Sequence, residues 1–249
     1  MGGDVRPTLI VVTAHPDDEA FGFGGTLARY GWQRVRTVLV TLTDGAAGQT
    51  GGLVPQANLA ARRQAELYHS ARILGVSHVE QWGAPDGALN TVPPESLVAR
   101  LLALFRAERP AVIATFGPEG GGNQHPDHQA ASALVTAAWR RWREDAPQTR
   151  LAYITVAPSV AEQSDIPYSH AHVRVDISAA LAVKRAAFYA HRTQKGDRAY
   201  YEAYQQAQGP FEWFHLVDET PPARWNDLFT NLPVQPKEAP ITFLAEESE

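Results

Sequence analysis

The stretch TLIVVTAHPDDEAFGFGGTLARY, residues 8–30, decides the fold that the sequence predicts. Its first apolar run, Leu9 to Val12, is short and rich in β-branched residues, which is typical of a buried strand. Pro16 fixes its own φ and disfavours helical backbone at His15, so the strand must end there. A glycine-containing helix follows. Acidic side chains and an imidazole therefore gather at the carboxyl end of a strand, where open α/β sheets bind ligands.

The acidic residues of this turn favour either a cation site or a capped helix start. Neighbouring carboxylates oppose each other's ionisation, and a divalent cation removes that penalty. His15 and Asp18 offer a nitrogen and a carboxylate, a ligand pair that first-row metals accept. Asp17 would then point elsewhere and stay free to handle a proton. The alternative is a helix with Asp17 or Asp18 as its N-cap and Glu19 in its first turn.

A second stretch, GPEGGGNQHPDH at residues 117–128, repeats this arrangement. Its glycines and proline indicate a loop, which follows an apolar strand at 111–116 and leads into a helix at 129–143. If the two strands are parallel neighbours, His128 could join His15 and Asp18, leaving room for water as in catalytic zinc sites. Taken alone, His125 and His128 could also be helix-cap or surface histidines.

The rest of the chain alternates strands with helices. Further strands are predicted at 35–43, 79–82, 149–157 and 173–177, and further helices at 58–74, 95–109 and 178–191. This alternation predicts an α/β fold with a mostly parallel, doubly wound sheet. The glycines at 22–25 lack the spacing of a dinucleotide-binding turn, and acidic residues crowd the place of a pyrophosphate.

Length and composition predict a single domain, residues 1–249, with its core at about 8–217 and an irregular, proline-rich extension at 218–249. The net charge of −5, without a basic block, argues against a nucleic-acid partner. The chain has no cysteine, which excludes disulfides, thiolate ligands and a cysteine nucleophile. No apolar signal sequence precedes Thr8, and no apolar run reaches membrane-spanning length, so we expect a cytoplasmic protein.

The two motifs, Ala14 to Glu19 and His125 to His128, resemble those of the LmbE-like, or PIG-L, zinc de-N-acetylase superfamily. Further resemblances extend over about residues 8–217. They are RQAEL at 63–67 with LGV at 74–76, PDG at 85–87, Lys184 with HRTQ at 191–194, and FEWFHLV at 211–217. The resemblance implies a Rossmann-like fold with helices on both faces of the sheet and the site at the carboxyl ends of the strands.

The resemblance also implies roles for individual residues. Zn²⁺, or Fe²⁺ or another divalent metal, would be held by His15, Asp18 and His128. Asp17 would be the general base, and either Asp17 or His125 would pass a proton to the leaving amine. Protonated His125 would face the developing oxyanion, with Asp127 holding its ring and raising its pKa.

Arg63 and Asp86 match family residues that contact a sugar. The alternatives are a surface ion pair of Arg63 with Glu66 and an ordinary turn at Asp86. The chain departs from the family pattern at Asp44 and Ala46, where many members carry Arg and Glu. It also has Asn123 where some members have a tyrosine, so a tyrosine contribution is absent or comes from elsewhere.

The resemblance therefore predicts a hydrolase that removes an N-acetyl group from an N-acetylglucosamine-type amino sugar or its conjugate. The aglycone stays open, and related enzymes suggest an assembly of three or six copies. Two other functions are compatible with the sequence: an amidase on a non-sugar N-acyl substrate, or a non-catalytic sugar-binding protein on the same fold. Retention of both Asp17 and His125 speaks against the binding protein.

Overall fold

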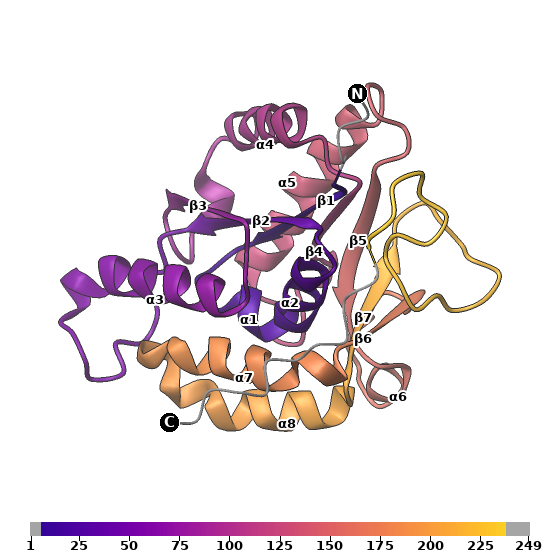
Figure 1. The fold of residues 1–249 in the computed structure, drawn as a ribbon. Helices are drawn as coiled ribbons and strands as arrows, with labels where there is room; N and C mark the ends of the chain where they lie inside the picture. Colours follow the sequence, from indigo (N-terminus) through magenta and orange to yellow (C-terminus); the bar gives the residue numbers. More distant parts are fainter. Residues whose placement is uncertain (1–5, 238–249) are drawn as a thin grey trace.

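The computed structural model describes residues 6–237 of the chain. Most of the segment before Thr8, and residues 238–249 of the predicted extension, lie outside the described residues. Seven strands form one sheet in the order β3-β2-β1-β4-β5-β7-β6 (Figure 1). Their bounds are β1 Thr8–Thr13, β2 Arg36–Thr43, β3 His78–Ala84, β4 Val112–Phe116, β5 Arg150–Thr155, β6 Val173–Asp176 and β7 Phe211–Leu216.

The first five strands are parallel, and β7 pairs antiparallel with both β5 and β6. Every residue of β1 and β4 is buried, which is why both segments are continuous apolar runs rather than alternating ones. The predicted α/β fold with a mostly parallel sheet is confirmed. The antiparallel pairing of β7 is an addition that the sequence analysis did not contain.

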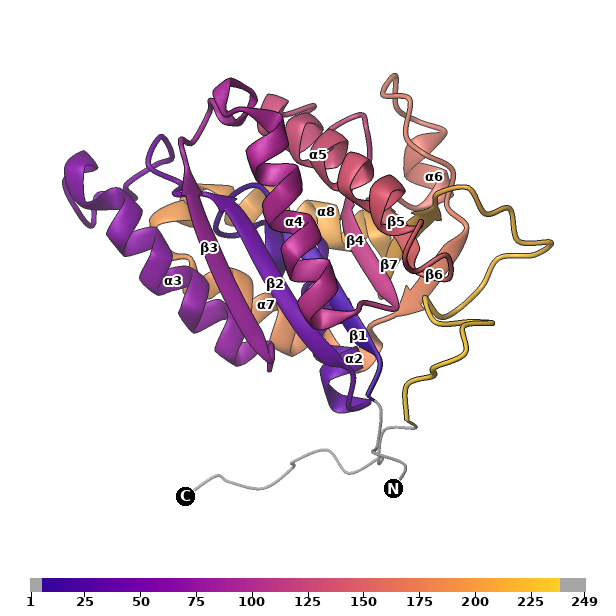
Figure 2. The ribbon, with the colours of Figure 1, turned by 90° about the horizontal axis from the view of Figure 1, so that it is seen from above.

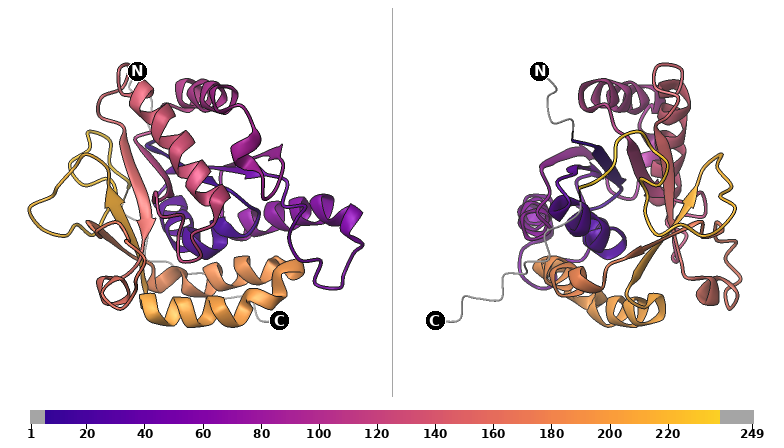
Figure 3. Two further views of the ribbon diagram at one scale, coloured as in Figure 1. Left: turned by 180° about the vertical axis from the view of Figure 1, so that it is seen from behind. Right: turned by 45° about the vertical axis from the view of Figure 1, so that its right-hand side comes forward.

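Helices cover both faces of the sheet. The α-helices are α1 Asp18–Gly22, α2 Gly24–Trp32, α3 Leu59–Ile73, α4 Pro94–Glu108, α5 Pro126–Trp142, α6 Pro158–Ala161, α7 Leu181–Ala190 and α8 Arg198–Gln208. Figure 2 shows α4 and α5 on one side of the strands, with α7 and α8 on the other. Both views of Figure 3 show α7 and α8 lying side by side. The predicted doubly wound arrangement is therefore present.

The order of the strands reverses next to β1. Strand β1 pairs with β2 on one side and with β4 on the other, and both pairings are parallel. The chain leaves β1 through residues 14–17 and leaves β4 through residues 117–125. Because the carboxyl ends of parallel strands lie at the same edge of a sheet, both loops meet at this reversal point, where doubly wound folds bind ligands.

The proline-rich extension packs against the sheet as far as the structure describes it. Residues 218–237 contain no helix or strand, yet Leu228 and Phe229 are fully buried. The Leu228 amide donates to the Tyr30 hydroxyl at 2.8 Å, and Arg150 bonds the Thr230 carbonyl. Residues 218–237 are thus irregular in backbone but contribute to the core. Within residues 6–237, no helix combines the length and apolarity needed to cross a bilayer.

Candidate active site

The turn after β1 is tight and strained. Asp17 has a φ of 126°, a backbone conformation that residues other than glycine rarely adopt. The Asp17 amide donates to Glu19 Oε2 at 2.9 Å, and the His15 amide donates to Asp18 Oδ2 at 2.7 Å. Asp17 precedes α1 but makes no side-chain capping bond to it. The Asp17 carboxylate therefore does not act as the helix cap that was the alternative to a role in the site.

Three side chains bring potential metal ligands together. His15 Nδ1 lies 3.5 Å from Asp18 Oδ2, and His128 Nε2 lies 3.2 Å from Asp18 Oδ1 and 3.3 Å from His15 Nδ1. Ligand atoms about 2.05 Å from a tetrahedral zinc ion would lie roughly 3.3 Å apart. The three residues predicted as ligands therefore have the spacing and donor chemistry that such an ion requires. His15 and His128 can also be grouped with His125 around a common point.

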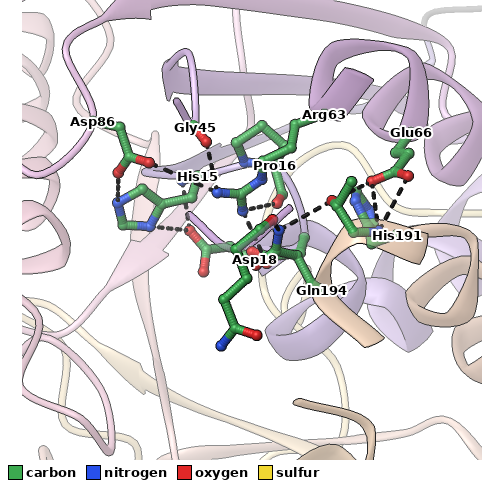
Figure 4. Close-up of polar contacts among 12 residues, drawn as sticks. His15, Pro16, Asp18, Gly45, Arg63, Glu66, Asp86, His191 and Gln194 are labelled. Carbon is green, nitrogen blue, oxygen red and sulfur yellow. Dashed lines mark hydrogen bonds and ion pairs between the residues drawn. The ribbon is translucent and has the colours of Figure 1, made fainter. Parts of the chain in front are cut away.

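The second nitrogen of each histidine ring has its own partner. His128 Nδ1 lies 3.1 Å from the Gly120 carbonyl oxygen. His15 Nε2 lies 3.2 Å from both Asp86 Oδ1 and Asp127 Oδ2, and Figure 4 shows the ring between the Asp86 and Asp18 carboxylates. Such partners hold the proton on the outer nitrogen and turn the other nitrogen toward a metal.

The surroundings of His15 favour positive charge. Burial lowers its pKa, but the carboxylates of Asp127, Asp18 and Asp86 outweigh burial and raise the pKa to about 12. A cluster of carboxylates that stabilises a cationic ring this strongly would also stabilise a bound divalent cation. The electrostatics of the site therefore agree with the spacing of the ligand atoms.

Arg63 braces the turn that carries Asp17. Its guanidinium is almost fully buried, and Nη2 donates to the Pro16 carbonyl at 2.5 Å and to Asp17 Oδ2 at 3.0 Å. Nη1 donates to the Gly45 carbonyl at 3.0 Å, so one side chain joins two loops (Figure 4). The alternative of a surface pair with Glu66 is wrong, because Glu66 bonds Arg62 and Thr193 instead.

Asp17 has the ionisation expected of a general base near neutral pH. Burial raises the pKa of Asp17, and Arg63 partly opposes the effect, which leaves the pKa at about 6. A carboxylate with this pKa accepts protons more readily than an exposed aspartate, yet stays ionised at pH 7. The predicted base therefore has the required charge state.

Asp127 holds the His125 ring through its backbone amide, and the net pKa shift of His125 is opposite to the predicted one. His125 Nδ1 accepts the Asp127 amide at 3.1 Å, while the Asp127 carboxylate accepts the Gly87 and Leu89 amides and contacts His15. Burial and the His15 and His128 rings lower the pKa of His125, against the opposing effect of Asp127. His125 therefore carries its proton on Nε2 as a neutral ring. The Asp127 amide holds the His125 ring, and the Asp127 carboxylate orients His15.

Asp86 has contacts beyond those of an ordinary turn residue. Its side chain is 7% exposed and accepts the Ala47 amide at 2.9 Å, which joins it to the glycine-rich loop after β2. It also lies 3.7 Å from Arg63 Nη1. Asp86 thus borders the site next to His15 and Arg63. This position is compatible with the predicted contact between Asp86 and a sugar.

A buried network lies behind the turn. Glu19 Oε1 accepts the Ser70 hydroxyl at 2.5 Å and lies 2.6 Å from His191 Nε2, while Glu19 Oε2 holds the Asp17 amide. Gln194 donates to the Gln49 carbonyl at 2.8 Å. His191 and Gln194 therefore brace the site. The partners Ser70 and Gln49 carried no motif that could have identified them.

The candidate metal ligands, Asp17, Arg63, Asp86 and His125 border a cavity of about 690 Å³. Part of its wall carries no motif that the sequence reveals: Phe21, Glu119, Tyr168, Tyr200 and Tyr204. A helical spacing of Tyr200 and Tyr204 was visible, but the sequence does not indicate that α8 folds over the strand ends. Glu119 stood within the second motif without a recognisable partner.

Comparisons with known proteins agree with this geometry. Residues 10–139 match the family described as "PIG-L: GlcNAc-PI de-N-acetylase". A 1D-myo-inositol 2-acetamido-2-deoxy-α-D-glucopyranoside deacetylase of Saccharomonospora viridis is 31% identical, over 75% of this chain and 84% of that protein. A Bacillus subtilis protein named "Probable N-acetyl-alpha-D-glucosaminyl L-malate deacetylase 2" is 27% identical, over 76% and 84%.

A solved structure is similar in fold. The N,N'-diacetylchitobiose deacetylase from Pyrococcus horikoshii superposes with a TM-score of 0.68 at 22% identity, over 84% of this chain and 83% of that one. At this identity the likeness concerns the arrangement of strands and helices. The sequence matches, by contrast, extend over both strand-end loops.

Proposed function

Since the chain belongs to the PIG-L family of de-N-acetylases, we propose that it is a metal-dependent hydrolase of an N-acetylglucosamine-type amino sugar or its conjugate. One observation carries the proposal. The ligand atoms of His15, Asp18 and His128 lie 3.2–3.5 Å apart, beside a buried carboxylate, Asp17, whose pKa is raised to about 6. Amide hydrolysis needs a polarised carbonyl and a base in this combination.

A divalent cation held by His15, Asp18 and His128 would polarise the acetyl carbonyl and lower the pKa of a bound water. We expect Zn²⁺, although Fe²⁺ or another divalent ion suits the same donor atoms. Asp127 keeps the His15 ring oriented through Nε2, and the Gly120 carbonyl does the same for His128 through Nδ1. These contacts fix the ligand nitrogens before any ion binds.

Asp17 is assigned both proton transfers. As a carboxylate it accepts a proton from the attacking water, and as an acid it then protonates the departing amine nitrogen. Neutral His125 donates its Nε2 hydrogen to the acetyl oxygen, where negative charge develops. This assignment replaces the protonated His125 that the family resemblance implies.

The candidates for sugar contacts depend on which hydrogen-bonding groups of Arg63 and Asp86 already have partners in the protein. Arg63 is bonded to Pro16, Asp17 and Gly45, so its main role is to position Asp17 rather than to bind a hydroxyl. Asp86 keeps acceptor capacity beside His15 and is the better candidate for a sugar hydroxyl. The cytoplasmic location and the assembly of three or six copies stay predictions.

The proposal is tested by acetate release from methyl N-acetylglucosaminide, with an N-acetyl amino acid amide as the non-sugar comparison. We expect metal-dependent release from the sugar at least tenfold faster than from the amide. Faster release from the amide would identify an amidase instead. Sugar binding without release from either compound would identify a binding protein. When the same assay is applied to Asp17→Asn, the variant Asp165→Asn, at an exposed position, is the control for general effects of removing a carboxylate.

A further inference from the structure

The cavity has two chemically different parts. The part at the strand ends is polar and holds the metal ligands, Asp17 and Arg63. The other part is aromatic and is formed by helices α1, α7 and α8 and the segment before β6. Its rings belong to Phe21, Tyr168, Phe188, Tyr200 and Tyr204. The proposed hydrolysis uses only the polar part, so the aromatic part requires another explanation.

The aromatic part is a layered wall with an open outer ring. Phe21 stacks on Tyr200 with ring centroids 5.7 Å apart and an interplanar angle of 18°. Phe21 also contacts Tyr204 at 4.6 Å. Tyr200 is 55% exposed although it lines the cavity. A flat ring of a ligand could therefore continue this stack on Tyr200.

The aromatic part adjoins the loop that leads to the metal ligands. A Cβ added at Gly122 would lie 3.1 Å from the hydroxyl oxygens of both Tyr168 and Tyr200. The two tyrosines therefore approach the backbone of the β4–α5 loop closely, a few residues before His125. A substrate with its acetyl group at the metal site could thus extend along this loop to the tyrosines.

Near the tyrosines lies the Glu119 carboxylate, which makes no ion pair with any lysine, arginine or histidine of residues 6–237. Glu119 is 8% exposed; its Oε2 accepts a long 3.4 Å bond from Ser169, and its Oε1 has no hydrogen-bond partner among residues 6–237. Burial raises the pKa of Glu119. Of the lysines and arginines in the described chain, only Arg63 lines the cavity, and both of its Nη atoms are engaged by Pro16, Asp17 and Gly45, which leaves only Nε without a partner among residues 6–237. A ligand carboxylate would be repelled here.

We propose that the aromatic part is an aglycone subsite that stacks an uncharged aromatic ring on Tyr200 and rejects aglycones that carry a carboxylate. The inference rests on the proposed function, because it assigns the aglycone of the same substrate. It specifies a conjugate in which an aryl group is joined to N-acetylglucosamine. Stacking provides the attraction, and Glu119 provides the repulsion that makes the subsite selective.

Four glycosides of N-acetylglucosamine separate the chemical classes: phenyl, cyclohexyl, 2-hydroxyethyl and carboxymethyl. With zinc-loaded wild-type protein, we expect kcat/KM for the phenyl glycoside to exceed that for the hydroxyethyl glycoside about tenfold. The cyclohexyl glycoside should fall between them, and the carboxymethyl glycoside should be the poorest. Equal values for phenyl and hydroxyethyl, or a preference for carboxymethyl, would overturn the proposal. Equal kcat/KM values for the phenyl and cyclohexyl glycosides would overturn the claim that the subsite prefers an aromatic ring.

Two variants assign the effects to residues. Tyr200→Ala should lower the phenyl-to-hydroxyethyl ratio about 5–10-fold, as expected for loss of one aromatic stack. Tyr68→Ala, another exposed tyrosine but away from the cavity, should leave the ratio unchanged. Glu119→Gln should raise the carboxymethyl-to-hydroxyethyl ratio about fivefold. An unchanged ratio in Tyr200→Ala would contradict the subsite.

Equilibrium binding keeps this inference separate from the proposed function. If no glycoside releases acetate, the hydrolase proposal fails, and calorimetry of the phenyl and hydroxyethyl glycosides then decides the subsite. Tighter binding of the phenyl glycoside by about 5–10-fold, lost in Tyr200→Ala, would still support an aromatic subsite. Equal affinities would refute it.

Discussion

The two loops that meet at the site hold their residues in different ways. In the β1–α1 turn, residues 14–17, buried side chains fix the backbone: Arg63 bonds the Pro16 carbonyl, and Glu19 bonds the Asp17 amide. In the β4–α5 loop, residues 117–125, glycine conformations shape the path instead. Gly120 and Gly121 have φ angles of 78° and 76°, and the Gly120 carbonyl contacts His128.

This difference corresponds to what each loop does. The short turn carries His15 and the strained Asp17, which must be placed accurately for proton transfer. The longer loop reaches from the metal site toward the tyrosines, where substrates differ most. Asp127 connects the two, because it belongs to the helix after the second loop and holds His15 of the first. Variants at this connection and in each loop test the comparison.

The largest effect is expected where the two loops are joined. Asp127→Asn removes the charge that orients His15 and should weaken zinc affinity about 10–100-fold, the usual cost of losing such an outer partner. Zinc competition with a chelating dye measures this change. Asp145→Asn, at an exposed position, is the matched control. Unchanged zinc affinity in Asp127→Asn would mean that the two loops are independent.

In the first loop, Arg63→Lys should lower kcat about tenfold with little change in KM. Lysine keeps the charge but cannot bond Pro16, Asp17 and Gly45 together, so the base loses its position. Arg62→Lys is the control, because the neighbouring Arg62 pairs with Glu66 and does not line the cavity. A rise in KM at constant kcat would instead assign Arg63 to sugar binding, as the family resemblance implied.

In the second loop, Gly120→Ala should weaken zinc affinity about fivefold. A Cβ there would lie 2.7 Å from Gln129 Cγ and 2.9 Å from the His125 carbonyl oxygen, so the carbonyl that holds His128 must move. Gly83→Ala has a similar φ of 74° and no atom within 4 Å of the added Cβ. It should show only the backbone cost of roughly 1 kcal/mol in thermal unfolding. Equal zinc affinities in the two variants would contradict this view of the loop.

The smallest effect concerns pH. Burial raises the pKa of Asp17 to about 6, and the ionised form is the base, so activity is present above this pH and lost below it. A bound cation favours the carboxylate and moves the loss to lower pH. The acidic limb of kcat/KM should therefore have its midpoint at or below about 6. A midpoint above pH 7 would show that another group is the base.

The sequence was sufficient to predict the sheet and the meeting of His15, Asp18 and His128 at one edge of it. A continuous apolar run identified β1 directly before His-Pro-Asp and β4 before the glycine-rich loop that leads to the second His-Pro-Asp, and parallel pairing then brought His15 and His128 together. The apolar runs and the His-Pro-Asp motifs are each formed by neighbouring residues in the sequence, and only the pairing of β1 with β4 joins distant ones. Their chemistry is also restricted, because few residue types bind first-row metals.

The sequence was insufficient where side chains meet across long separations. The Asp127 carboxylate lies closer in sequence to His125 than to His15, yet it contacts His15, because the start of α5 points it across the reversal point. The tyrosines of α8 carry no motif, and only the packing of α7 and α8 brings them to the cavity. The burial of Leu228 in an irregular segment was equally invisible to hydrophobic periodicity.

The most direct test of the central claim is acetate release from methyl N-acetylglucosaminide by wild-type and Asp17→Asn protein, each assayed after metal removal and after reloading with zinc. We predict release only from zinc-loaded wild-type protein, and a rate about 10²–10⁴-fold lower for zinc-loaded Asp17→Asn. Zinc content must be equal in the two loaded proteins, because Asp17 is not assigned as a ligand. Equal rates with and without zinc, or full activity in Asp17→Asn, would contradict the account.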